Sequence, residues 1–175
     1  MLAAVHGGTR QAPAISLLTS PGIVLIHNGQ EFGEAYPVPE SGNDRIVPRL
    51  LRWAVEAGDG IGQSLYGLYQ RLISLRVKHQ SLRSPKFFPA MNQDGYGVFP
   101  DIGIVVYHRY GAADDGSLER FIIVLNYSDT DRFFDVPFST NGVWQELLNG
   151  GVLTVQSYLL PNTLINSNWG KIYYQ

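Results

Sequence analysis

The side chains best suited to chemistry lie in one short polar segment. Asn28, Gln30 and Glu31 follow directly after four apolar residues at positions 23–26. An apolar run of this kind predicts a strand covered on both faces, as in a parallel sheet. The segment after the C-terminal end of such a strand usually carries the functional groups. Amide and carboxylate groups can hold a ligand by hydrogen bonds, so residues 28–34 are the first candidate site.

Other kinds of site have weaker support. The chain has no cysteine, which excludes thiolate zinc sites and cysteine nucleophiles. Its four histidines lack metal-ligand spacing, so neither a metal nor a cofactor is expected. Asp129 and Asp131 flank Thr130, where a calcium site or a turn would fit, and the turn is favoured. Trp144 and Trp169 fit either a carbohydrate-binding surface or core packing, and core packing is favoured.

Composition limits the partners of the chain. With 175 residues it is shorter than the roughly 250 of a complete (β/α)8 barrel. Its net charge of -2 argues against nucleic acid, and its apolar runs fall short of the roughly 20 residues of a membrane span. The start, MLAAVHGG, lacks the basic and apolar regions of a secretion signal, which slightly favours the cytoplasm.

The elements that must position residues 28–34 change in character near Ser84 and Pro85. Before this point the spacing predicts helices at 9–19 and 61–83 around the strand at 23–26. After it, short apolar stretches between Gly- and Asp-containing turns predict an antiparallel sandwich. The expected strands are 102–110, 118–127, 132–136, 143–148, 153–160 and 171–174. Because a parallel strand needs parallel neighbours, the first half is expected to be the closing part of a larger α/β domain.

Three motifs in order resemble the α-amylase superfamily, glycoside hydrolase family 13. Residues 17–33, LLTSPGIVLIHNGQEFG, are similar to the last helix–strand unit of its barrel. Residues 68–76, LYQRLISLR, together with HQSLR at 79–83, resemble the final barrel helix. Residues 124–128, VLNYS, resemble a strand of the C-terminal β-sandwich. The resemblance implies an α+β chain in which 1–84 closes a (β/α)8 barrel and 85–175 form an antiparallel β-sandwich.

The resemblance also implies a function. Members hydrolyse or transfer α-glucosidic bonds with an Asp nucleophile, a Glu acid/base and a second Asp. The seventh-strand motif Asn-His-Asp does not occur in this sequence, so no catalytic residue is assigned and the chain alone is expected to be inactive. The implied substrate-binding residues are Asn28, Gln30, Glu31 and, in the loop at 35–60, Trp53. Turn formation by Asn28 and Gln30, loop hydrogen bonds of Glu31 and packing of Trp53 are the alternatives.

The implied partner of the intact parent protein is an α-glucan or maltooligosaccharide. The alternative is a non-catalytic module, in which the sandwich binds carbohydrate or has a purely structural role. A third possibility is a domain that binds nothing, in which the apolar residues 23–26 would need a cover. A homodimer, or a rearranged N-terminal half, would supply it.

Overall fold

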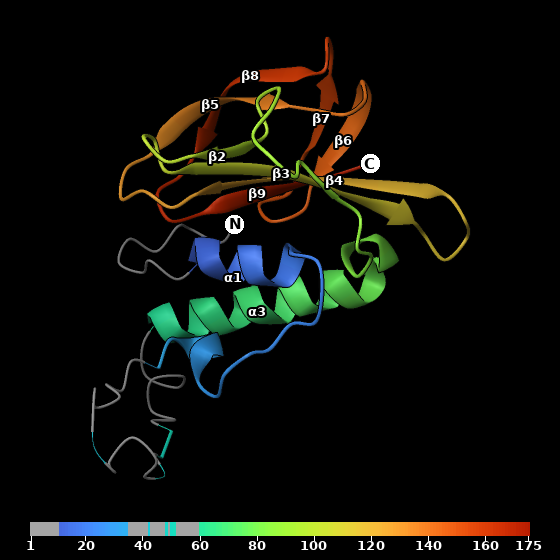
Figure 1. Cartoon of the computed structure of the whole chain (residues 1–175). Coiled ribbons are helices and arrows are strands. Elements are labelled where there is room, and N and C mark those ends of the chain that lie inside the picture. Colours follow the sequence, from blue (N-terminus) through green and yellow to red (C-terminus); the bar gives the residue numbers. More distant parts are fainter. Residues whose placement is uncertain (1–10, 35–41, 43–47, 49, 52–59) are drawn as a thin grey trace.

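The computed structural model describes residues 11–34, 42, 48, 50, 51 and 60–175. In this part of the chain a layer of helices lies beneath two antiparallel sheets (Figure 1). The helical elements are α1 (Gln11–Thr19), the 3-10 turn η1 (Gln30–Phe32), α3 (Gly60–Lys78) and the 3-10 turn η3 (Gln80–Leu82). None of these helices is long and apolar enough to cross a membrane.

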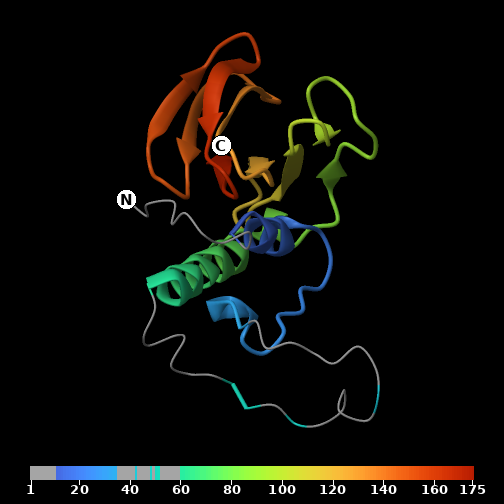
Figure 2. The same ribbon diagram turned by 90° about the vertical axis from the view of Figure 1, so that its left-hand side faces the viewer.

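The strands form a large sheet and a small one. The large sheet has the order β1-β3-β4-β9-β6-β7, with β2 also paired to β3, and the small sheet pairs β5 with β8. The strands are β1 (Phe87–Phe88), β2 (Gly97–Phe99), β3 (Ile104–Ala112), β4 (Leu118–Asn126), β5 (Arg132–Pro137), β6 (Gly142–Glu146), β7 (Val152–Val155), β8 (Leu159–Ile165) and β9 (Gly170–Tyr174). Figure 2 shows the two sheets curving over each other on one side of the helices.

The apolar run of β4 is explained by burial on both faces. Phe121, Ile123 and Leu125 pack against the helices, while Ile122 and Val124 pack against the small sheet. All five side chains are fully buried. Burying one such side chain stabilises the fold by about 1.5–3 kcal/mol. The large sheet is therefore the middle layer of the molecule, and the α+β class with antiparallel sheets is confirmed.

Helix α3 is shorter than the helix predicted at 61–83. Its buried stripe, which includes Leu65, Leu68 and Leu72, agrees with the predicted spacing. The helix ends at Lys78 because His79 adopts an extended backbone, with φ −109° and ψ 107°. The chain turns there and places the buried His79 imidazole 2.6 Å from the carboxylate of Glu119 on β4. A contact with a distant residue thus accompanies the end of the helix.

The prediction of a doubly buried strand at 23–26 is wrong. These residues are extended but belong to no strand, and Ile23 and Leu25 are exposed. Val24 and Ile26 pack against the helix-side core. A parallel strand requires parallel neighbours, and the described part of the chain contains no parallel pairing. One face of the apolar run is therefore covered and the other is open.

An arginine of α3 holds this extended segment in place. The guanidinium of Arg76 donates hydrogen bonds to the carbonyl oxygens of Leu18 and Ser20 at 2.9 Å and of Gly22 at 2.6 Å. It also donates to the carbonyl of Leu82 at 2.9 Å. Five donors in a planar fork suit an arginine for collecting several carbonyls at once. This fork fixes where the chain leaves α1.

The other predicted strands are present, but one of them is divided into two strands. Residues 153–160 form parts of β7 and β8, separated by a turn in which Ser157 and Tyr158 have φ of 56° and 58°. Non-glycine residues rarely adopt positive φ, so the sequence carries no signal for this turn. Strands β1 and β2 were not predicted, because two and three residues are too short to show a pattern.

The structure bears on two ambiguous features of the second half. Trp144 and Trp169 are buried, so the core-packing interpretation is confirmed and neither forms a surface for carbohydrate. Asp131 accepts a hydrogen bond of 2.8 Å from the backbone N–H of Ser167, and Asp129 accepts one of 3.0 Å from the side chain of Asn168. These two carboxylates therefore connect neighbouring loops.

Candidate functional site

The polar segment after residue 26 folds into a compact turn. The N–H of Gln30 donates to the carbonyl of His27 at 2.9 Å, and the N–H of Glu34 donates to the carbonyl of Gly29 at 2.8 Å. Gly29 has φ +85°, and a Cβ at this position would lie 2.6 Å from the Cβ of Glu34. Only glycine fits both the positive φ and the close approach. The turn therefore depends on Gly29.

A buried aromatic ring anchors this turn to α3. Phe32, the last residue of η1, is 2% exposed, and η1 packs on α3. Tyr69 of α3 is also buried, at 3% exposure. With its aromatic residue inside, η1 leaves its polar residues Gln30 and Glu31 half-buried at the edge of the anchor. The anchor thus determines which groups of the segment face solvent.

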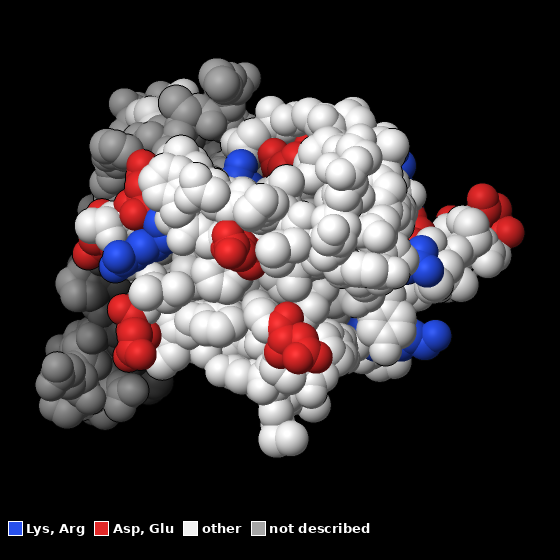
Figure 3. Space-filling model, turned by 90° about the horizontal axis from the view of Figure 1, so that it is seen from above, with Lys and Arg blue, Asp and Glu red and all other residues white. Residues whose placement is uncertain are grey.

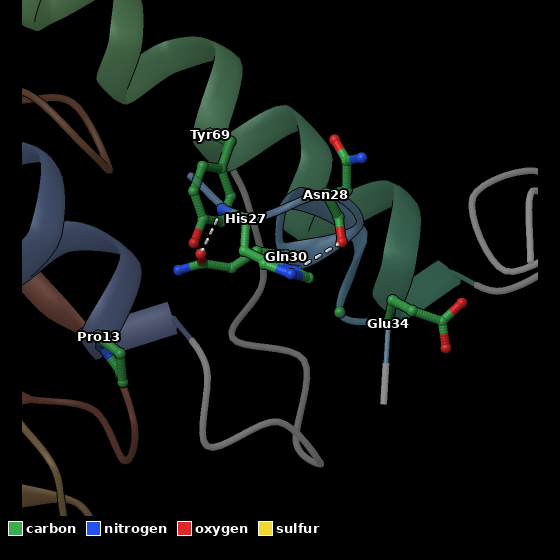
Figure 4. Close-up of a pocket in the computed structure, with 7 residues that line it drawn as sticks. Pro13, His27, Asn28, Gln30, Glu34 and Tyr69 are labelled. Carbon is green, nitrogen blue, oxygen red and sulfur yellow. Dashed lines mark hydrogen bonds between the residues drawn. The ribbon is translucent and has the colours of Figure 1, made fainter. Parts of the chain in front are cut away.

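The segment borders a cavity of about 340 Å³. The lining residues are Pro13, His27, Asn28, Gln30, Gly33, Glu34 and Tyr69. Figure 4 shows the side chain of Gln30 lying beside the Tyr69 hydroxyl and that of Glu34 on the far side of the turn. Gln30 Oε1 accepts the backbone N–H of His27 at 3.1 Å, and His27 Nδ1 lies 3.1 Å from the carbonyl oxygen of Asn28. The Gln30 side chain is therefore oriented by the backbone of its own turn.

The cavity presents mostly neutral hydrogen-bonding groups. Burial raises the pKa of the Tyr69 hydroxyl, a hydrogen bond with Gln30 opposes this shift, and the Glu31 carboxylate adds to it. Tyr69 therefore stays a neutral hydroxyl at physiological pH. Among the described lining residues, Glu34 supplies the one carboxylate. Retaining glycoside hydrolysis needs two carboxyl groups about 5–5.5 Å apart, and the described lining of this cavity contains one.

The predicted site residues separate into three groups. Asn28 and Gln30 line the cavity, as their place in the sequence suggested. Glu31 is half-buried on η1 and is not among the lining residues. Trp53 lies outside the described residues. None of these positions tests a binding role, so all four remain predictions.

Three residues of the cavity were not predicted as site residues. His27 was noted only as part of the motif, although it directly precedes Asn28. Tyr69 lies in the apolar stripe of α3, and a stripe of this spacing indicates core packing. Its hydroxyl reaches the cavity because α3 passes beside η1, which local spacing does not show. Pro13 of α1 is brought to the cavity in the same way.

Comparisons with known proteins bear on the fold. No protein-family model matches the chain, and no curated protein matches it by sequence. Solved structures do match. An Anoxybacillus α-amylase aligns with a TM-score of 0.64 and 19% identity, over 93% of this chain and 31% of the amylase. A type I pullulanase from Bacillus subtilis in complex with maltose aligns with a TM-score of 0.64 and 17% identity. The alignment covers 95% of this chain and 23% of the pullulanase.

A third structure agrees with these two. Pullulanase from Anoxybacillus sp. in complex with maltotriose aligns with a TM-score of 0.63 and 17% identity, over 95% of this chain and 22% of the pullulanase. The chain has the fold of the C-terminal part of α-amylases and pullulanases. It spans less than a third of the length of these three chains. The resemblance seen in the sequence motifs is thus confirmed for the fold.

Proposed function

We propose that this chain is the C-terminal part of a glycoside hydrolase that acts on α-glucans by hydrolysing or transferring α-glucosidic bonds. The observation that carries the proposal is the structural match, which includes 93–95% of the chain in the three comparisons described. Fold alone does not determine activity. The motif at 17–33 and the hydrogen-bonding groups of the cavity beside it support the proposal.

In this proposal residues 1–84 close a (β/α)8 barrel and residues 85–175 are its C-terminal sandwich. The open face of residues 23–26 supports this. Ile23 is fully exposed and Leu25 is 83% exposed. Beside them lies a groove of about 440 Å³, lined largely by apolar residues that include Val24, Ile26 and Ile73. Apolar surface next to an extended, unpaired backbone suits a neighbouring strand.

The cavity then forms one wall of a substrate cleft. Asn28 and Gln30 would hydrogen-bond to sugar hydroxyls, with Glu31 and Trp53 as the further predicted contacts. The carboxylates that break the glycosidic bond would come from outside this chain. The role of the chain is therefore to bind and orient the substrate and to complete the barrel.

The test combines turnover with binding. The purified chain should show no turnover of maltooligosaccharides, and maltotriose should perturb amide NMR signals of residues 27–34. Asn28→Ala and Gln30→Ala should each weaken this binding severalfold. Gln70→Ala removes an exposed amide from α3 and should leave it unchanged.

Two results would overturn the proposal. Turnover by the chain alone would show that the catalytic carboxylates are within it. If maltotriose does not perturb the signals of residues 27–34 at any concentration up to its solubility limit, these residues do not form a substrate-binding wall. Tight binding that leaves residues 27–34 unperturbed would favour the non-catalytic binding module.

A further inference from the structure

A second hollow, of about 590 Å³, lies on the small sheet, away from the cavity beside Gln30. Its walls include Asp94, Phe133, Phe134, Asp135, Leu159 and Asn162. Figure 1 places β5 and β8 on the side of the large sheet opposite the helices. This hollow, here called the β5–β8 hollow, is therefore separate from the candidate site at residues 27–34.

One wall is a tight turn between β1 and β2. Asp94 and Gly95 have φ of 50° and 80°, and Gln93 and Tyr96 exchange backbone hydrogen bonds of 3.0 and 2.8 Å across them. Two residues of positive φ closed by such a pair are typical of an Asp-Gly hairpin turn. A Cβ on Gly95 would lie 3.3 Å from the ring of Pro137. The turn thus rests on the end of β5, which fixes Asp94 at the rim.

The floor of the hollow is an irregular point of the small sheet. The register between β5 and β8 shifts between Phe134 and Val136. At this shift Asp135 Oδ1 accepts the N–H of Asn162 at 2.7 Å, and Asn162 has φ 50°. Bulges of this kind redirect side chains and are common beside binding sites. The hydrogen bond holds Asp135 in a defined position.

An exposed aromatic ring completes the hollow. Phe133 is 64% exposed, whereas Phe134, its neighbour on β5, is half-buried and packs against Phe99 at a centroid distance of 5.2 Å. A phenylalanine left in water loses the stabilisation that burial would provide. The open face of Phe133 is thus available for contact with an apolar surface of a ligand.

We propose that the β5–β8 hollow binds an α-glucan oligosaccharide, the α-linkage resting on the function proposed above. The exposed ring of Phe133 would contact the C–H face of a glucose unit. Asp94, Asp135 and Asn162 would hydrogen-bond to its hydroxyls, for which carboxylates are strong acceptors. An exposed ring beside polar groups that fix orientation is the pattern of a small-molecule site.

The charges of the hollow argue against an anionic ligand. None of its lining residues is Lys or Arg, so it offers nothing that attracts a phosphate or another anion. Figure 3, a view from above, shows separate acidic patches on a largely uncharged surface. One oxygen of Asp135 accepts the N–H of Asn162, so the carboxylate is held in place and its other oxygen can accept a hydrogen bond from a ligand. A glucan held here would be anchored away from the cavity beside Gln30.

The test is an amide NMR titration of the full chain with maltohexaose, with cellohexaose and with a hexalysine peptide. Maltohexaose should perturb residues 94–95, 133–135 and 159–162. Phe133→Ala should weaken this binding about tenfold, which corresponds to the loss of one aromatic contact. Asp94→Asn keeps a residue that tolerates positive φ and should weaken it severalfold. Tyr127→Ala removes an aromatic side chain of 41% exposure from the end of β4 and should change nothing at the hollow.

Each other outcome is informative. If cellohexaose binds at the hollow and maltohexaose does not, the α-glucan assignment of the hollow is overturned, and the proposed function still depends on the response of residues 27–34. If maltohexaose perturbs only residues 27–34, the hollow is overturned and the proposed function stands. Binding of hexalysine without either sugar would overturn the hollow as a carbohydrate site, as would unchanged maltohexaose affinity in a folded Phe133→Ala protein.

Discussion

The guanidinium of Arg109, on β3, donates a hydrogen bond of 2.7 Å to the carbonyl oxygen of Thr19, the last residue of α1. Arg109 is fully buried. It also donates to the carbonyls of Lys86, Ser81, Leu82 and Ser84. Burial lowers the pKa of Arg109 to about 10, opposed by Tyr107 and assisted by Arg76, so the side chain stays charged at neutral pH. This charge joins the sheet to the helix layer through backbone carbonyls.

Replacing Arg109 should destabilise the whole chain. Arg109→Met leaves several buried carbonyls without their donor, and we expect a loss of about 3 kcal/mol or more in the free energy of unfolding by urea. Arg109→Lys should recover only part of this, because one ammonium cannot reach all of these acceptors. Lys78→Met, at an exposed position, should change stability by less than about 0.5 kcal/mol. Equal losses at positions 109 and 78 would contradict this account.

Glu119 should make the chain sensitive to acid. Burial raises its pKa, but hydrogen bonds from Ser81 at 2.5 Å and from His79 at 2.6 Å outweigh this, and the net shift is downward from 4.5. The stabilisation is therefore present above about pH 4.5 and is lost as the pH falls through the lowered native pKa. Glu119→Gln should lower stability at pH 7 and give a shallower decline in unfolding free energy between pH 5 and 3. Parallel declines in the two proteins would refute this.

Titration of His108 should change the stability of the chain at a higher pH than titration of Glu119 does. Burial, with repulsion from Arg120, lowers its pKa from 6.5 to about 4. The unfolded chain then binds a proton that the folded chain does not, so stability is complete above about pH 6.5 and falls as the pH drops toward 4. The total loss is about 3 kcal/mol, and it should disappear in His108→Phe. Urea unfolding at half-unit steps between pH 7 and 4 measures it. A slope that survives the substitution would assign the titration to other groups.

Gly29 offers a test of the turn at the candidate site. Gly29→Ala combines positive φ with a Cβ placed 2.6 Å from Glu34, so it should cost more than the about 1–2 kcal/mol of a left-handed alanine and should weaken maltotriose binding. Gly22→Ala is the matched control, because φ there is +92° but nothing lies within 4 Å of the new Cβ. Gly22→Ala should therefore lose only the free energy of the strained backbone, and maltotriose binding should stay unchanged. Equal effects on binding would show that the turn does not position the ligand groups.

The open face of residues 23–26 should cause self-association. Ile23, which lines an apolar groove, and Leu25 are both exposed to water, and covering such an apolar surface is favourable. Light scattering should give a mass above 19.4 kDa that rises with protein concentration. The double substitution Ile23→Ser and Leu25→Ser should return the chain to a monomer. A wild-type chain that stays monomeric at high concentration would count against this prediction.

Much of the fold was accessible from local pattern. The buried stripe of α3 and the strands around residues 104–126 follow spacing and turn residues, which act over a few positions. Asn28 and Gln30, which line the cavity, were predicted from their place after an apolar run, and their binding role stays a prediction. Tyr69 was not found, since its place in the helix stripe indicates only burial.

Local sequence pattern determined the helices, most strands and the polar turn after residue 26. It also indicated the likeness to the C-terminal part of α-amylases. Tertiary structure alone decided the features that depend on distant partners. Residues 23–26 remain unpaired because no parallel neighbour lies beside them in the described chain. Trp144 is buried because the two sheets close over it, and Phe133 is exposed because it lies on the outer side. A side chain's neighbours across the sheet or beneath the helices are set by long-range packing, which sequence spacing does not encode.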